Sequence, residues 1–204
     1  HDFGWDDGLI CGGSVQGLIL PHAAQAADLW RALAACEEPR RWGVKSDFTI
    51  AWAEDDPTAT WLYQETVSPP FALWIAGSGH IAQAVAPLAL QLDFAVTVFD
   101  DRPELANPQH FPAATHLRVG NWGELLATPL PRQPVFGLIV TRGHQHDALV
   151  LADWIHRPFV FLGMIGSRRK ARLIREQFAA QRVASAEAMD RLACPVGLEI
   201  HAQG

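Results

Sequence analysis

Two glycines and an acid at fixed spacing mark the first candidate site in this sequence. Gly77, Ser78 and Gly79 follow an apolar run and lead into a helical pattern, and Asp100 ends the next apolar run. A phosphate can approach the backbone of such a turn, and the helix that starts at His80 presents free N–H groups to it. An acid about 20 residues further on accepts a hydrogen bond from a ribose hydroxyl. The spacing therefore predicts a site for an NAD-like nucleotide; the alternative is a glycine turn that binds nothing.

Charged residues continue directly after that acid. Asp101 and Arg102 follow Asp100 and precede a proline. We expect Asp101 and Arg102 to line the same site. The alternative is an ion pair within a turn, which contributes little free energy.

Two histidines and a further acid follow another apolar run, in the segment TRGHQHD at residues 141–147. That run is typical of a central parallel strand, and ligands of open α/β sheets bind at the carboxyl ends of such strands. A metal site is disfavoured because His144 and His146 would point to different sides of a helix and no third ligand is near. We therefore expect Thr141, His144 and His146 to contact a ligand or to pack through hydrogen bonds. Arg142 either contacts the same ligand or is a surface charge.

Cations crowd the start of a further helical pattern, in the segment GMIGSRRK at residues 163–170. Ser167 fits the N-cap position, and Arg168 and Arg169 follow it in the first turn together with a lysine. The helix dipole disfavours each of these charges by about a few tenths of a kcal/mol. We expect an anionic ligand near Gly166 and Ser167 to offset this cost; the alternative is a solvated basic face.

A thiol lies in a glycine turn near the start of the chain, where Cys11 precedes Gly12 and Gly13. A thiolate is the soft ligand that molybdenum, copper or a sulfur-transfer reaction needs. A lone cysteine is more often an inert buried residue, so the sequence leaves both interpretations of Cys11 open. Cys36 and Cys194 are expected to pack in the interior.

The elements that must position these residues alternate between strand and helix after residue 70. Apolar runs predict strands, and spaced apolar residues predict helices. The predicted strands cover residues 71–76, 95–100, 115–119, 136–140 and 159–162, and the predicted helices cover residues 80–92, 146–155 and 167–181. The fold class is therefore α/β, with a Rossmann-like doubly wound parallel sheet at residues 71–204.

A smaller α+β domain is predicted at residues 1–70. Its pattern predicts a helix over residues 23–36 and strands over residues 17–20, 48–53 and 60–65. The linker between the domains is Ser68-Pro69-Pro70, because consecutive prolines interrupt any regular element.

Composition limits the class of protein. The 204 residues carry a formal net charge of −6, which argues against a general nucleic-acid binder. No apolar run approaches the roughly 18 residues that cross a membrane, and the chain does not begin with a secretory signal. The three cysteines are widely spaced, so we expect a reducing cytoplasm rather than a disulfide framework. The chain begins without Met and stops without a helix-ending pattern, so we also expect it to be incomplete at both ends.

Taken together, these segments resemble the xanthine dehydrogenase accessory proteins, the XdhC/CoxI-like family. The matching segments follow the family's order: CGG from Cys11, GSGHIAQAVAPLA from Gly77, VTVFDDRPE from Val96, TRGHQHD from Thr141, GMIGSRRK from Gly163 and CPVGLEI from Cys194. Members of the family have more chain ahead of CGG, and they usually continue after the last segment into a helix that closes the sheet.

The resemblance implies a protein that binds the molybdenum cofactor, as molybdopterin or its dinucleotide, while its terminal sulfur ligand is installed. It implies delivery of the cofactor to an apo molybdenum hydroxylase of the xanthine dehydrogenase type, with a cysteine desulfurase as a second partner. By this likeness Cys11 and Gly12 contact the cofactor near its molybdenum or handle its sulfur. We expect a chaperone rather than a turnover enzyme. We also expect a homodimer, for which eight tryptophans supply aromatic surface.

Two rival functions remain at this point. One is an NAD-dependent oxidoreductase with His144 or His146 as the catalytic residue, although residues 1–70 are few for a substrate domain. The other is a redox sensor module in which NAD binding changes the oligomeric state. The sequence also leaves open whether the turn at residues 77–79 binds the phosphate of the pterin or a separate dinucleotide.

Overall fold

The structure, a computed structural model, describes residues 17–198. Two compact units divide the chain between Val67 and Ser68. The boundary predicted after residue 70 lies just beyond this division.

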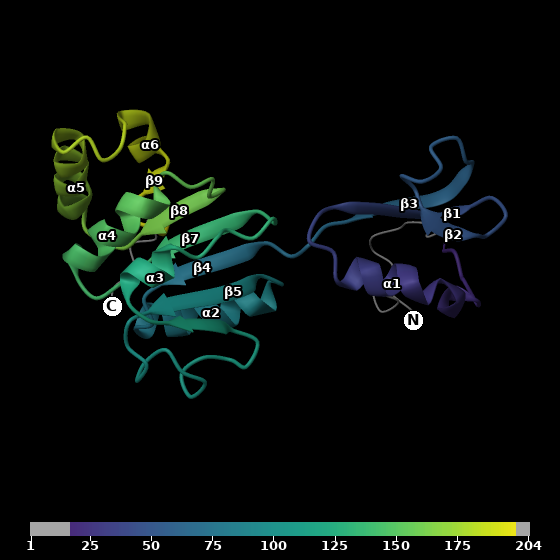
Figure 1. Cartoon of the computed structure of the whole chain (residues 1–204), viewed down its shortest axis with the longest axis horizontal. Coiled ribbons are helices and arrows are strands. Elements are labelled where there is room, and N and C mark those ends of the chain that lie inside the picture. The colour runs from purple at the N-terminus through teal and green to yellow at the C-terminus, as the bar shows by residue number, and fades with distance from the viewer. Residues whose placement is uncertain (1–16, 199–204) are drawn as a thin grey trace, which may run out of the picture. The chain divides into compact units, whose positions relative to one another are not determined.

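The smaller unit combines a three-stranded antiparallel sheet with a helix (Figure 1). Its elements are η1 (Ala23–Ala26), α1 (Ala27–Ala34), β1 (Arg40–Lys45), β2 (Ile50–Trp52) and β3 (Trp61–Val67). β1 lies at the centre and pairs with both β2 and β3. Trp30 of α1 packs edge-on against Trp42 of β1, with ring centroids 4.8 Å apart, so the helix is fixed on the sheet by aromatic contact.

The helix and the later two strands of this unit confirm the prediction, but the central strand β1 was not predicted. Its alternation of apolar and polar residues is interrupted by Gly43. A Cβ atom at Gly43 would lie 2.5 Å from the carbonyl oxygen of Tyr63 and 2.6 Å from the Trp61 ring, so glycine permits the close approach of β1 and β3. The strand predicted at residues 17–20 is wrong, because these residues pair with no strand among those that the structure describes.

The larger unit contains a six-stranded parallel sheet with the order β6-β5-β4-β7-β8-β9. Its strands are β4 (Ala72–Ala76), β5 (Ala95–Asp100), β6 (His116–Val119), β7 (Val135–Ile139), β8 (Phe161–Met164) and β9 (Leu192–Ala193). Its helices are α2 (His80–Gln91), α3 (Trp122–Leu126), α4 (His144–Trp154), α5 (Arg168–Ala180) and α6 (Ala186–Asp190). The predicted Rossmann-like α/β fold is confirmed. The elements α3, α6 and β9 were missed because such short segments show no periodicity.

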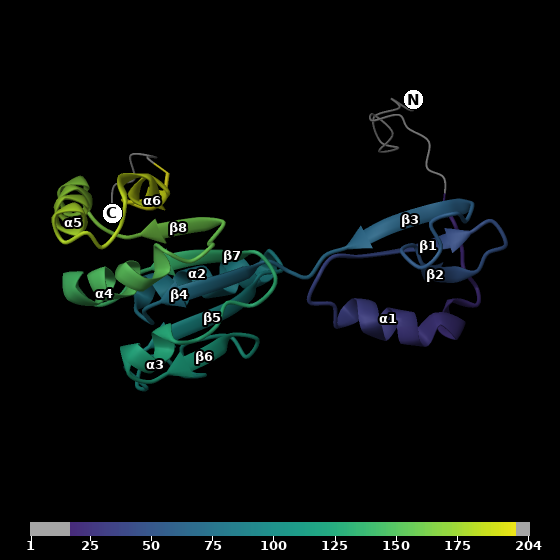
Figure 2. The same cartoon turned by 45° about the horizontal axis from the view of Figure 1, so that its top comes forward.

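Helices cover both faces of this sheet, as Figures 1 and 2 show. On one face α2 packs its small residues Ala82, Ala86 and Ala89 against Val96 and Val98 of β5. Small side chains let this helix lie close to the strands. The start of α2 is thereby held at the carboxyl end of β4.

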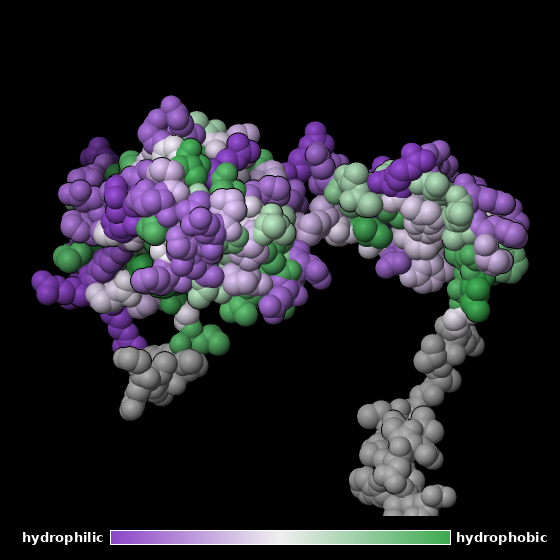
Figure 3. Space-filling model, turned by 90° about the horizontal axis from the view of Figure 1, so that it is seen from below, coloured by the Kyte–Doolittle hydropathy of each residue, from purple (hydrophilic) through white to green (hydrophobic). Residues whose placement is uncertain are grey.

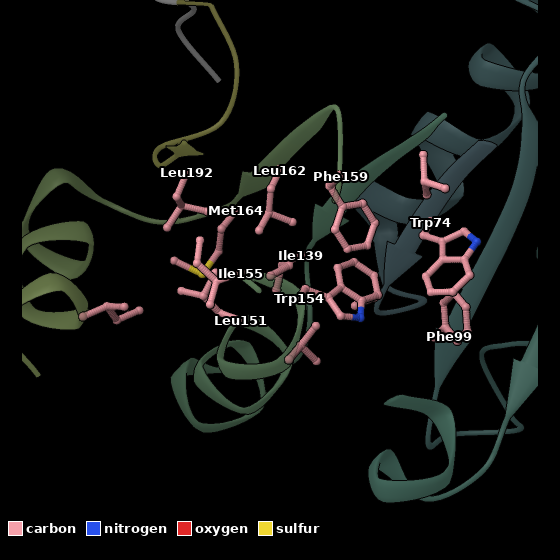
Figure 4. Close-up of a cluster of buried hydrophobic side chains, with 14 of the residues drawn as sticks. Trp74, Phe99, Ile139, Leu151, Trp154, Ile155, Phe159, Leu162, Met164 and Leu192 are labelled. Carbon is pink, nitrogen blue, oxygen red and sulfur yellow. The ribbon is translucent and has the colours of Figure 1, made fainter. Parts of the chain in front are cut away.

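Large aromatic rings fill the core on the opposite face, around α4 (Figure 4). The ring centroid of Trp154 lies 5.0 Å from that of Phe159 and 6.0 Å from that of Trp74. Trp74 also lies 4.8 Å from Phe99. Burial of one such side chain stabilises a fold by about 1.5–3 kcal/mol. This cluster therefore anchors the strands whose carboxyl ends carry the candidate site.

The surface of the larger unit is mixed in character. The face visible in Figure 3 combines hydrophilic and hydrophobic residues. Leu88 of α2 and Leu92, which follows this helix, are among the exposed apolar side chains of the larger unit. Within residues 17–198, no helix combines the length and the apolar character that crossing a membrane requires.

Candidate functional site

The parallel sheet has a switch point between β4 and β7. From β4 the chain continues to β5 and β6 on one side, and from β7 it continues to β8 and β9 on the other. Ligands of open α/β sheets bind at the carboxyl ends of two such strands. The glycine turn after β4 and the segment at residues 141–147 after β7 both lie at this point.

Two helices begin beside the switch point without a side-chain cap. α2 starts after Gly79 and α4 starts after Gly143, and neither N-terminus has a side chain that accepts a hydrogen bond from its first turn. The first N–H groups of a helix lack intrahelical partners and carry the positive end of the helix dipole. Such donors bind phosphate. His80 and His144 are the first residues of these helices, and both are exposed.

The two glycines of the turn after β4 have different structural roles. Gly77 has φ of +111°, and a Cβ atom there would lie 2.9 Å from the Cα atom of Thr141. Only glycine allows this approach of the turn to the segment after β7. Gly79 has φ of −72°, and a Cβ atom there would have no atom within 4 Å. The backbone at Gly79 is therefore open to a ligand.

Asp100 is buried and binds the glycine turn itself. Its Oδ2 atom accepts hydrogen bonds from the backbone N–H and the hydroxyl of Ser78, both at 2.7 Å. Arg102 donates from Nε to Oδ1 at 2.9 Å, from Nη2 to Oδ2 at 2.8 Å, and from its backbone N–H to Oδ1 at 2.9 Å. The residue is 1% exposed. In the structure the polar groups of Ser78, Asp100 and Arg102 bind one another, and their contact with a ligand stays a prediction.

The hydrogen bonds to Asp100 keep it charged. Burial alone would raise the pKa of this carboxyl, but the hydrogen bonds from Arg102 and Ser78 outweigh burial and lower the pKa to about 2. The same carboxylate raises the pKa of Arg102. The pair is therefore a permanent ionic contact at neutral pH.

A second buried carboxylate holds the segment after β7 in the same way. Oδ1 of Asp147 accepts hydrogen bonds from the backbone N–H and the hydroxyl of Thr141, at 3.1 and 2.6 Å. Its Oδ2 atom pairs with Nζ of Lys170, which also donates to the carbonyl of Ile165 at 3.0 Å. In the structure the hydroxyl of Thr141 donates to Asp147, and contact of Thr141 with a ligand stays a prediction. Lys170 links the start of α5 to Asp147 and to the loop after β8.

The histidines of this segment do not gather around a metal position. His144 is exposed, whereas Asp147 is buried against Lys170. His146 lies with its Nε2 atom 3.9 Å from Oδ2 of Asp101. Within residues 17–198, no three side chains of His, Cys, Asp or Glu converge in a way that could hold a metal ion.

Asp101 and Arg142 form an ion pair that joins the loops after β5 and β7. Nη2 of Arg142 lies 2.8 Å from Oδ2 of Asp101, and the side chains are 52% and 22% exposed, respectively.

Trp122 lies beside this ion pair through its contact with His146. The centroid of the His146 ring lies 6.2 Å from that of the Trp122 ring. Trp122 is buried, and its indole N–H has no hydrogen-bond partner among the described residues. The sequence does not predict Trp122 as a residue near the site, because a tryptophan at this position is just as typical of the core.

The start of α5 agrees in part with the prediction. Ser167 is confirmed as the N-cap, since its hydroxyl accepts a hydrogen bond from the backbone N–H of Lys170 at 3.2 Å. Arg168 and Arg169 are exposed in the first turn. A Cβ atom at Gly166 would lie 2.7 Å from the Lys170 side chain, so this glycine makes room for the lysine. Contact of Gly166, Ser167 and the two arginines with a phosphate stays a prediction.

The cysteines fall into two groups. Cys11 and Gly12 lie outside the described residues, so their contact with a cofactor stays a prediction. Cys194 is confirmed as a packing residue, because it lies half-buried against the main core cluster and burial raises the pKa of its thiol. Cys36 is half-buried as well.

Comparisons with known proteins agree with this architecture. A family model described as the XdhC Rossmann domain matches residues 73–204. A curated Escherichia coli K12 protein, "Uncharacterized protein YqeB", is 35% identical over 132 residues, which are 64% of this chain and 24% of that protein. A crystal structure of a protein from Bacillus halodurans, described as a xanthine dehydrogenase, has a TM-score of 0.68 and 22% identity. That similarity covers 91% of this chain and 63% of the solved one. The chain thus spans about a quarter of the length of the curated relative.

Acid should destabilise the larger unit through Asp100. A carboxyl group whose pKa is lower in the folded than in the unfolded state stabilises the fold above its unfolded pKa, here near 3.8. That contribution is lost as the pH falls through the folded pKa. We expect the free energy of unfolding, measured with urea, to fall by about 2 kcal/mol from this source between about pH 4 and pH 2. Asp100→Asn should remove this part of the pH dependence; an unchanged pH dependence would contradict the assignment.

Removing Lys170 should leave the charge of Asp147 buried without its partner. Lys170→Met is expected to lower the free energy of unfolding by about 3 kcal/mol, and Asp147→Asn added to it should recover part of the loss. Arg172→Met is the matched control, because Arg172 is an exposed α5 residue that pairs with exposed Glu176, and it should change stability by less than about 0.5 kcal/mol. A double variant less stable than Lys170→Met alone would argue against the buried pair.

Proposed function

Because this chain belongs to the XdhC family, through a Rossmann domain at residues 73–204, we propose that it acts in the maturation of a xanthine dehydrogenase-type molybdenum hydroxylase. Its role would be to bind the molybdenum cofactor and to assist its sulfuration and its insertion into the apo-enzyme. One observation carries this proposal: the uncapped N-termini of α2 and α4 lie beside the open backbone of Gly79 at the switch point.

These residues suit the phosphate that molybdopterin and its dinucleotide carry. The free N–H groups at the start of α2 and α4 supply donors without any side-chain movement. The open space at Gly79 allows a phosphate oxygen to reach the backbone. His80 and His144 add donors at the first position of each helix, and Arg142 adds a cation nearby. The site would therefore hold the cofactor by its phosphate.

The electrostatics of the edge support an anionic ligand. The two buried carboxylates beside the switch point are each neutralised, Asp100 by Arg102 and Asp147 by Lys170. Neither therefore contributes a net negative charge that would repel a phosphate. The cofactor, when bound, supplies a molybdenum centre with a terminal sulfur ligand. A thiolate suits such a metal or sulfur transfer, and this is the role proposed for Cys11.

An NAD site receives less support from the same geometry. Asp100, which the spacing assigns to the ribose, is 1% exposed and saturated with internal hydrogen bonds. An NAD ribose would therefore lack this acceptor. The oxidoreductase alternative also needs a catalytic base held in place by a partner. His144 is exposed at the start of α4, and no such partner is recorded for it among the described residues.

The proposed partners follow from the same role. A cofactor that is sulfurated and then inserted must pass between a sulfur donor and an acceptor enzyme. We propose a cysteine desulfurase as the donor and the apo-hydroxylase as the acceptor, with the chain itself acting as a homodimer.

Retention of molybdenum tests the proposal. The full chain is mixed with isolated molybdenum cofactor under anaerobic conditions, and the molybdenum that elutes with it on gel filtration is measured. Gly79→Val should weaken binding by about tenfold or more, which corresponds to about 1.4 kcal/mol, because the new side chain fills the approach to the backbone. Gly17→Val is the matched control, since Gly17 is also a glycine with open space around a Cβ position.

Three outcomes would count against the proposal. If the wild-type chain retains no molybdenum, cofactor binding fails. If Gly79→Val and Gly17→Val retain equal amounts, the cofactor does not bind at the switch point. Steady NADH oxidation by a chain that retains no molybdenum would favour the oxidoreductase alternative.

A further inference from the structure

The ion pair between Asp101 and Arg142 crosses the carboxyl end of β4. Asp101 follows β5, Arg142 follows the end of β7, and β4 lies between these two strands. Ser78 is hydrogen-bonded to Asp100, which directly precedes Asp101. Gly77 packs against Thr141, which directly precedes Arg142. The turn after β4 therefore touches the neighbours of both partners, so the ion pair lies beside the proposed phosphate site.

Arg142 is held less firmly than the other paired cations of this edge. Its side chain is 52% exposed, compared with 18% for Arg102 and 22% for Lys170. Arg102 and Lys170 neutralise buried carboxylates, so their departure would leave a buried charge without a partner. Arg142 makes one hydrogen bond to Asp101, and an ion pair of this exposure contributes little free energy. Of these three paired cations, Arg142 is therefore the one that a ligand can recruit most readily.

We infer that Arg142 passes from Asp101 to the phosphate of the ligand, so that Asp101 competes with the ligand for the guanidinium. A guanidinium binds phosphate through two parallel charge-assisted hydrogen bonds, which are stronger than its one hydrogen bond to Asp101. A ligand without such an anion gives Arg142 no replacement partner. The site thereby selects phosphomonoesters or diphosphates. This inference rests on the proposed function and assigns the side chain that recognises the phosphate.

Asp101 keeps basic side chains within ion-pair distance after the exchange. Nε2 of His146 lies 3.9 Å from its Oδ2 atom, and Nε of Arg102 lies 4.0 Å from its Oδ1 atom. The side chain is also partly exposed to water. Departure of Arg142 therefore leaves no unpaired buried charge, and the exchange has no large electrostatic cost.

Inorganic pyrophosphate serves as the probe, with its binding to the full chain measured by isothermal titration calorimetry. Asp101→Asn removes the competitor and should tighten binding by up to about fivefold, the limit that an exposed ion pair sets. Arg142→Gln should weaken binding. Asp101→Asn added to Arg142→Gln should have no further effect, because no guanidinium is left to release. Glu104→Gln is the charge control, since Glu104 is an exposed acid in the same loop, and it should leave the affinity unchanged.

Several results would overturn the exchange. Tightening by Asp101→Asn that persists with Arg142→Gln, or that Glu104→Gln reproduces, would show a general charge effect. Weaker binding by Asp101→Asn would show that Asp101 contacts the ligand directly. Absence of pyrophosphate binding in both the wild type and Asp101→Asn would refute the phosphate recognition itself. A chain that shows the exchange but retains no molybdenum would refute the proposed cofactor and leave the exchange standing.

Discussion

The carboxyl edge of the larger unit depends on two buried carboxylates that bind backbone at the ends of neighbouring strands. Asp100 accepts the N–H and hydroxyl of Ser78, and Asp147 accepts those of Thr141. A backbone N–H just beyond a strand has lost its sheet partner, and leaving it unsatisfied in the interior is costly. Each carboxylate supplies the missing acceptor, and a cation then neutralises it. These contacts tie the loop after β4 to the end of β5, and the segment after β7 to the loop after β8.

The side chains that stabilise this edge are therefore different from the backbone donors that remain available to a ligand. Ser78, Asp100, Thr141 and Asp147 are buried, whereas in the described part of the chain the N-termini of α2 and α4 have no side-chain cap. Donors that are already fixed before binding need no ordering when a ligand arrives, and this strengthens binding without adding contacts. Because the chain belongs to the XdhC family, the proposed function assigns the molybdenum cofactor to this set of donors.

The sequence predicts the strands and helix starts around the candidate site much better than the contacts of its side chains. Apolar runs followed by glycine or serine place β4, β7 and β8, and Ser167 is recognisable as a cap, because all these signals are local. The orientation of the Asp100 carboxylate, in contrast, depends on contacts that form only in the folded chain. The spacing from Gly79 suits a ribose acid, but the hydroxyl of Ser78 and the guanidinium of Arg102 draw the carboxylate inward. The predicted segments therefore lie at the carboxyl ends of the strands as expected, whereas the internal hydrogen bonds of their side chains could not be predicted.

The exposure of the Asp101–Arg142 pair has a consequence for the influence of dissolved salt. Mobile ions screen exposed charge pairs, with a screening length of about 8 Å at physiological ionic strength. When Arg142 changes from one exposed anion to another, the number of exposed ion pairs stays the same, so added salt weakens the starting and final states alike. The contribution of Arg142 to holding a phosphate is therefore buffered against ionic strength, whereas a cation that begins unpaired would lose its contribution as salt rises.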